Sequence, residues 1–174
     1  GLVPSDAPAP ALGVNLVFNG DAEDDRGFDT SELDQAVSGW LDPGPNGFTV
    51  IRYGAPAGFP GADAESRGSN FFCAGSSESS TLAQMIDLGP LRETIQSGRV
   101  RYTLSARLGG FEAQDDSIEI TAVFYGDNGQ EIGGGTIPAV TASDRGGRTC
   151  LVDRTVSGHV ESGATRVEVR LTGT

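Results

Sequence analysis

Apolar and polar residues alternate along most of this chain with the two-residue period that is typical of β-strands. The alternation is clearest in residues 99–110, RVRYTLSARLGG, where Val100, Tyr102 and Leu104 are separated by Arg and Thr. Between Gly-Pro and Ser-Gly, residues 90–97 allow one short turn of helix. The remaining apolar runs predict strands over 14–19, 47–54, 69–75, 79–88, 99–110, 116–126, 131–140, 148–158 and 165–173.

About eight or nine short strands separated by turn residues predict an all-β protein, a two-sheet antiparallel β-sandwich of the jelly-roll type. The Asn128-Gly129 pair between two of these runs is a hairpin-turn signal. Residues 1–13, rich in Pro and Ala, predict an extended N-terminal segment, and residues 14–174 a single sandwich domain.

The amino-acid composition disfavours some classes of binding partner. The 174 residues include 26 Gly, and 24 acidic against 12 basic side chains give a formal net charge of −12. An acidic chain is repelled by phosphate backbones, which disfavours nucleic acid and anionic membrane as partners. No apolar run approaches the length of a membrane-spanning helix, so we expect no membrane insertion.

The two cysteines indicate the cellular compartment in which the protein resides. Cys73 and Cys150 lack the spacing of a metal site and predict one disulfide in an oxidising compartment, two buried free thiols being the alternative. The chain opens on Gly and a Pro/Ala-rich stretch that resembles the spacer after a processing site. Together these features predict a secreted, extracellular protein.

Residues 15–25, NLVFNGDAEDD, place an apolar run, an Asn-Gly turn and four carboxylates next to one another. Ca²⁺ prefers about six to eight oxygen ligands, and a tight turn with alternating acids can present several of them together. The alternative is that the acids extend into solvent. The spacing is not that of an EF-hand loop.

The opening NLVFNGDAE followed by Gly39-Trp40 resembles the galactose-binding-like jelly rolls, which include many carbohydrate-binding modules of secreted proteins. The resemblance implies a structural Ca²⁺ held by Asn19, Asp21 and Glu23, and a glycan or cell-surface polysaccharide as partner. Such modules usually end on a further strand with an Asp that closes the calcium site, whereas this chain stops at LTGT.

Ligand contacts are predicted around the long loop after residue 54. Tyr53 precedes this loop, and Asp63 and Arg67 within it can hydrogen-bond sugar hydroxyl groups. A single Trp in a sandwich is more often part of the core, which is our interpretation of Trp40. No Gly-x-Ser-x-Gly elbow or positioned base is visible, and nothing selects one pair of carboxylates. We therefore expect no enzymatic activity.

Two functions remain. The first is a secreted, non-catalytic carbohydrate-binding or adhesive module stiffened by calcium. The second is a structural subunit of an extracellular filament or surface assembly. In that case the domain would associate with itself through an exposed sheet edge or the N-terminal segment, and strand exchange would complete the sheet.

Overall fold

The computed structural model describes residues 9–31, 35–42, 47–56, 59–61, 68–75 and 78–174. Eight strands and one short helical segment make up its regular structure, which confirms the predicted all-β fold and the helical turn near 90–97. In chain order they are β1 (Thr49–Arg52), β2 (Asn70–Cys73), β3 (Ser80–Asp87), the 3₁₀ turn Gly89–Leu91, α1 (Arg92–Gln96), β4 (Arg101–Gly110), β5 (Ile118–Tyr125), β6 (Glu131–Ile137), β7 (Cys150–His159) and β8 (Arg166–Gly173).

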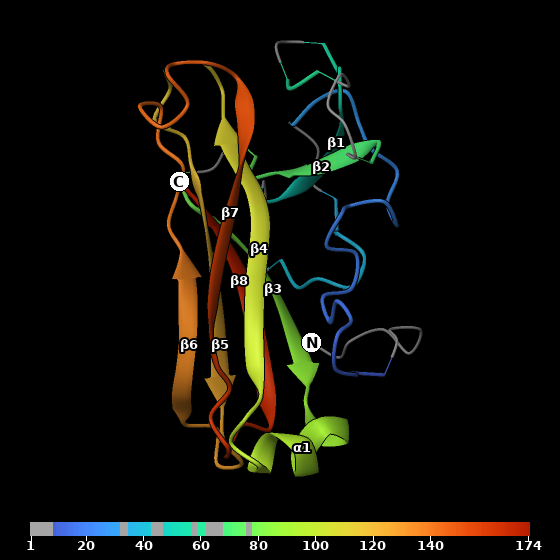
Figure 1. Ribbon diagram of the computed structural model, residues 1–174. Coiled ribbons are helices and arrows are strands. Elements are labelled where there is room, and N and C mark those ends of the chain that lie inside the picture. Colours follow the sequence, from blue (N-terminus) through green and yellow to red (C-terminus); the bar gives the residue numbers. More distant parts are fainter. Residues whose placement is uncertain (1–8, 32–34, 43–46, 57–58, 62–67, 76–77) are drawn as a thin grey trace.

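The long strands form two layers (Figure 1). One layer is a four-stranded antiparallel sheet in the order β3-β8-β5-β6, and the other is the antiparallel pair β4-β7. Leu82, Ile120 and Phe124 of the four-stranded sheet are buried against Tyr102 and Leu104 of β4. The alternation of apolar and polar positions thus produces a sandwich, because each strand turns its apolar side toward the other layer.

A third sheet, β1 paired with β2, belongs to a different part of the molecule (Figure 1). We call the described residues between 9 and 75 the N-terminal region. It consists mainly of turns, and in Figure 1 it lies beside β3 and β4 with β1 and β2 running crosswise to the long strands. No helix among the described residues is long and apolar enough to cross a membrane.

The strand predicted at 14–19 is absent from the structure, and this part of the prediction is wrong. Its last residue, Asn19, has a φ of 47°, which starts a turn instead of continuing a strand. The backbone N–H and C=O of Phe18 bond to the side chain of Gln84, not to a neighbouring strand. An apolar run alone does not show where its backbone groups find partners.

Candidate functional site

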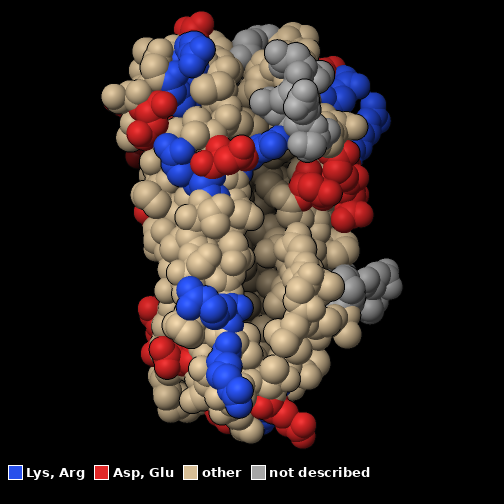
Figure 2. Space-filling view, in the orientation of Figure 1, with Lys and Arg blue, Asp and Glu red and all other residues tan. Residues whose placement is uncertain are grey.

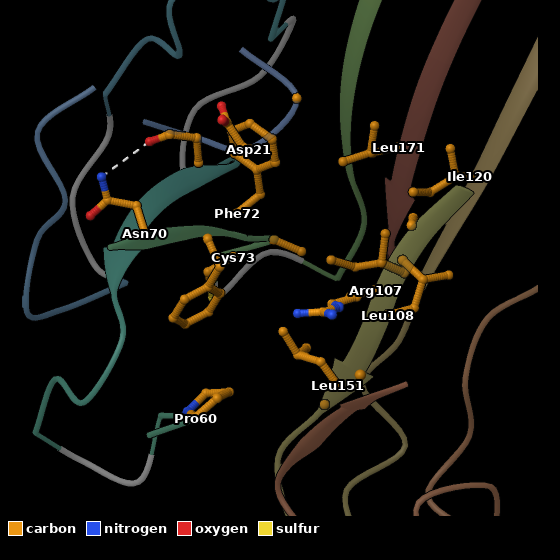
Figure 3. A pocket seen from close by; sticks show the side chains of 18 of the residues that line it. Asp21, Pro60, Asn70, Phe72, Cys73, Arg107, Leu108, Ile120, Leu151 and Leu171 are labelled. Atoms are coloured by element: carbon orange, nitrogen blue, oxygen red, sulfur yellow. Dashed lines mark hydrogen bonds between the residues drawn. The ribbon is translucent and has the colours of Figure 1, made fainter. Parts of the chain in front are cut away.

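A hollow lies between the N-terminal region and the sandwich (Figure 2). It is a cleft of about 970 Å³. One wall is formed by β2 and the turn around residue 20, the opposite wall by β4, and the floor by Ile120, Val169 and Leu171 (Figure 3). The floor residues belong to the buried side of the four-stranded sheet, so the cleft reaches down to the core of the sandwich.

The β4 wall is the edge of a strand. Every residue from 104 to 110 lines the cleft, whereas a strand that showed one face would contribute every second residue. Among the described strands β4 pairs only with β7. The N–H of Val160 donates to the C=O of Val100, so even-numbered residues of β4 bond to β7. The backbone N–H and C=O groups of odd-numbered residues such as Ser105 therefore point toward the cleft.

The opposite wall is rich in aromatic rings. Tyr53 and Phe71 lie with ring centroids 4.9 Å apart, and Phe59 follows Phe71 at 6.0 Å. All three line the cleft. The adjacent Phe72 packs edge-on against Trp40 with ring centroids 5.8 Å apart, and both rings line the cleft while they pack, partly buried, against the core. Tyr53 was predicted as a ligand contact, and the structure places it in the cleft.

The acidic turn of residues 19–25 is held by hydrogen bonds. The buried side chain of Asn19 donates to the carboxylate of Asp25 and to the C=O of Ser38, and its carbonyl accepts from the N–H of Asp24. Asp25 also accepts from the N–H and the hydroxyl of Ser38. The indole N–H of Trp40 donates to the backbone C=O of Asn19. This network of hydrogen bonds holds the turn closed.

The same turn is docked onto β2 by Asn70. The Asn70 side chain donates to the C=O groups of Ala22 and Asp25, and its backbone N–H donates to the Glu23 carboxylate. A Cβ at Gly27 would lie 2.1 Å from the Asn70 side-chain oxygen, so the approach of the turn requires glycine there.

Asn19, Asp21 and Glu23 fit a calcium ion poorly in this arrangement. The oxygens of Asn19 already accept hydrogen bonds, one Glu23 oxygen accepts from Asn70, and one Asp21 oxygen accepts from the N–H of Glu23. Within the described ranges no group of three acidic, His or Cys side chains is placed to hold a metal. Structural calcium thus stays a prediction that the geometry does not favour.

Charged side chains cluster at the cleft mouth. Asp21, Asp24 and Asp116 line it, and each is exposed. Arg107 lines it from β4, and its Nε donates to Asp153 of β7 across a distance of 2.7 Å. Figure 2 shows acidic side chains gathered on the N-terminal-region side of the hollow.

Arg145 holds the far end of the cleft. Its guanidinium, buried to 2% exposure, donates to the C=O groups of Glu112, Gln114 and Arg148, while its Nε has no partner in the described part of the chain. Gln114 lines the cleft. A buried cation that binds backbone carbonyl groups fixes the path of the chain from 112 to 114.

The cysteines do not form the predicted disulfide. Cys73 lies in β2 and Cys150 begins β7, on two different sheets, and both are free. Burial raises the pKa of the Cys73 thiol, a hydrogen bond with the Gly75 backbone opposes the rise, and the nearby Asp116 adds to it. The raised pKa keeps the thiol in its protonated form at neutral pH. Asp63 and Arg67, the other predicted ligand contacts, lie outside the described residues.

Comparison with known proteins finds a similar fold but no family. No family model and no curated protein matches this chain. A solved structure, the enzymatically active domain of tailspike protein 4 of bacteriophage CBA120, matches with a TM-score of 0.52 and 17% sequence identity. The match covers 91% of this chain and 19% of the tailspike chain, so this chain corresponds to about a fifth of that protein's length. At this identity the likeness concerns the fold alone.

The comparison corrects one expectation. We predicted that the chain is not an enzyme, and this prediction is contradicted, because the matched domain that contains this fold is enzymatically active. The prediction rested on the lack of a linear catalytic motif. Carboxylates from distant segments, such as Asp21 and Asp116, come to one cleft only through the fold, so a search for linear motifs does not test such pairs.

Proposed function

We propose that this chain is a carbohydrate-binding domain and that its glycan lies in the cleft between the N-terminal region and β4. The observation that carries the proposal is the aromatic wall formed by Tyr53, Phe59 and Phe71. Aromatic rings offer flat apolar surfaces onto which the C–H faces of sugar rings pack. Secretion of the domain to a place where glycans are accessible is part of the same proposal.

The β4 wall supports the proposal from the opposite side. A sugar presents hydroxyl groups around its rim, and each hydroxyl needs a partner once it leaves water. Backbone N–H and C=O groups at the free edge of β4, together with Gln114, supply donors and acceptors along the cleft. Apolar faces on one side and polar partners on the other are what an extended sugar chain requires.

The test is a titration of a panel of neutral and charged polysaccharides by calorimetry. We expect at least one glycan to bind and Tyr53→Ala or Phe71→Ala to weaken it at least tenfold, about 1.4 kcal/mol. The matched control is Tyr125→Ala, because Tyr125 lies against Arg166 away from the cleft. Binding that survives both cleft variants, or a panel without binders, would reject the proposal.

The same samples test for catalysis. If the bound glycan is cleaved, the exposed carboxylates of the cleft are the first residues to replace, because glycoside hydrolysis needs a pair of carboxyl groups beside the bond. Asp21, Asp24 and Asp116 are these candidates.

A second candidate function is self-association, and the free edge of β4 favours it. An unpaired strand edge beside an apolar floor can accept an extended segment from another copy. Light scattering over a wide concentration range separates the two functions. Association that titrates with protein concentration and is blocked by Ser105→Pro supports strand addition, whereas a monomer throughout leaves the glycan as the occupant.

A further inference from the structure

Three carboxylates of the cleft lack a cationic partner within the described part of the chain. Asp21, Asp24 and Asp116 line it, are exposed, and form no ion pair with any residue that the structure describes. They come from two separate segments, the acidic turn and the residues before β5. The negative charge is therefore a property of the cleft as a whole and not of one loop.

The basic side chain of the lining does not offset them. Arg107 is the one Arg among the described lining residues, and its Nε forms an ion pair with Asp153 of β7, which offsets its charge. The three exposed carboxylates outnumber the cations at the cleft, Arg107 and the buried Arg145, in a chain whose net charge is −12, and this balance favours a negative electrostatic potential there.

The floor strengthens this effect. Ile120, Val169 and Leu171 are buried apolar side chains, and charges above an apolar surface are screened less than charges in open water. A carboxylate, sulfate or phosphate on a bound glycan would lie close to fixed negative charges. A neutral sugar is not repelled by these charges, and its hydroxyl groups can donate charge-assisted hydrogen bonds to the same carboxylates.

We propose that the cleft selects neutral glycans and rejects anionic ones. This inference rests on the proposed function and adds the ligand class. The selection is electrostatic, with Asp21, Asp24 and Asp116 as the rejecting groups, while the aromatic wall and the β4 edge bind the sugar chain in either case.

The experiment compares two forms of one polymer. Galactomannan, or the strongest neutral binder of the panel in its place, is titrated beside a sample whose C6 hydroxyl groups have been oxidised to carboxylates. At about 20 mM salt we expect the oxidised form to bind at least tenfold more weakly. Near 500 mM salt the difference in affinity between the two forms should become several-fold smaller, because screening weakens repulsion between exposed charges.

Substitution identifies the rejecting groups. The variant D21N/D24N/D116N keeps a side-chain oxygen that can accept the hydrogen bonds from the N–H groups of Glu23 and Phe111. It should bind the oxidised polymer within about threefold of the neutral one. The control Glu93→Gln removes an exposed acid on α1, outside the cleft lining, and should leave the gap unchanged.

The outcomes separate the two proposals. Equal or tighter binding of the oxidised polymer by the wild-type protein overturns the inference and leaves the proposed function intact. A gap that persists at high salt and in the triple variant shows steric exclusion and also overturns the inference. If no glycan binds in either form, the proposed function itself fails.

Discussion

The two sides of the cleft are built by different interactions. On the sandwich side, β3 through β8 are joined by uninterrupted backbone pairing, as in the ten residue pairs of β4 and β7. On the N-terminal side, backbone pairing is limited to the four residue pairs of β1 and β2 and to single bridges at Phe28 and Leu41, and polar side chains bond to the backbone between them. Asn19, Asn70 and Gln84, all buried, make most of these connections.

The difference explains why the cleft lies where it does. Backbone pairing extends a sheet strand by strand, whereas side-chain hydrogen bonds anchor a turn at a few points and leave space between them. The N-terminal region is anchored to β3 through Gln84 and through the backbone bridge between Leu41 and Ala83, and none of its described strands pairs with β4. The edge of β4 and the floor of the sandwich therefore stay open to a ligand.

The largest effect should come from Gln84→Leu. The buried Gln84 side chain accepts from the N–H of Phe18 and donates to the C=O groups of Phe18 and Gly39. Leu removes the Gln84 hydrogen bonds to these part-buried backbone groups, at an expected loss of about 3 kcal/mol in the free energy of unfolding.

Urea denaturation measures this loss, with Met85→Leu as the matched control on the opposite face of β3. The control should lose less than about 1 kcal/mol. If the two variants are equally stable, the N-terminal region is not anchored through Gln84.

The second effect concerns the acidic turn. Asp25→Ala removes hydrogen bonds from Asn19 and from the N–H and hydroxyl of Ser38, and we expect a loss of about 2 kcal/mol in the free energy of unfolding. Asp29→Ala is the control, because it breaks only an exposed ion pair with Arg52 and should cost less than about 1 kcal/mol. Equal losses in the two variants would show that the turn is held by something other than this network.

The third prediction tests the β4 edge. Ser105→Pro removes an N–H that points away from β7, so the strand pairing survives while the cleft loses one donor. Glycan affinity should fall about tenfold, and Ser105→Ala should bind as the wild type does. Thr103 is also an odd-numbered residue of β4 but lies outside the cleft lining, so Thr103→Pro should leave the affinity for the glycan unchanged. A loss shared by all three variants would contradict the role of the edge.

The smallest effect is expected from calcium. Because hydrogen bonds already engage Asn19, Asp21 and Glu23, chelation followed by added Ca²⁺ should move the melting temperature by less than about 1 °C. An ion present at about a hundred times its Kd would add about 2.7 kcal/mol and raise the melting temperature by several degrees. Such a rise would restore the calcium prediction.

The strands of the sandwich could be predicted from the sequence because the alternation of apolar and polar residues reflects which side of each strand is buried. The strand predicted at 165–173 is β8, Arg166–Gly173, and the one predicted at 99–110 is β4, Arg101–Gly110. In these strands the backbone pairs with a neighbour whatever the side chains are, and the two-residue period alone decides which side faces the core.

The same reasoning fails where a side chain replaces a strand as partner. The apolar run 14–19 looks like a strand, but its backbone partner is Gln84, which is 66 positions away from Phe18. The aromatic wall was only partly predictable for a similar reason. Tyr53 stood out beside a long loop, whereas Phe59 joins it only through the fold of the N-terminal region. The free edge of β4 depends on sheet order, which periodicity does not encode.

The central claim is that a glycan occupies the cleft between these two regions. Backbone amide chemical shifts recorded while the neutral glycan is titrated into the labelled protein test it directly. We predict that shifts change together at Tyr53, Phe71, Ser105 and Gln114, on both sides of the cleft, and stay constant along β6. Changes confined to β6 and the outer face of the four-stranded sheet, or none at saturating glycan, would contradict it.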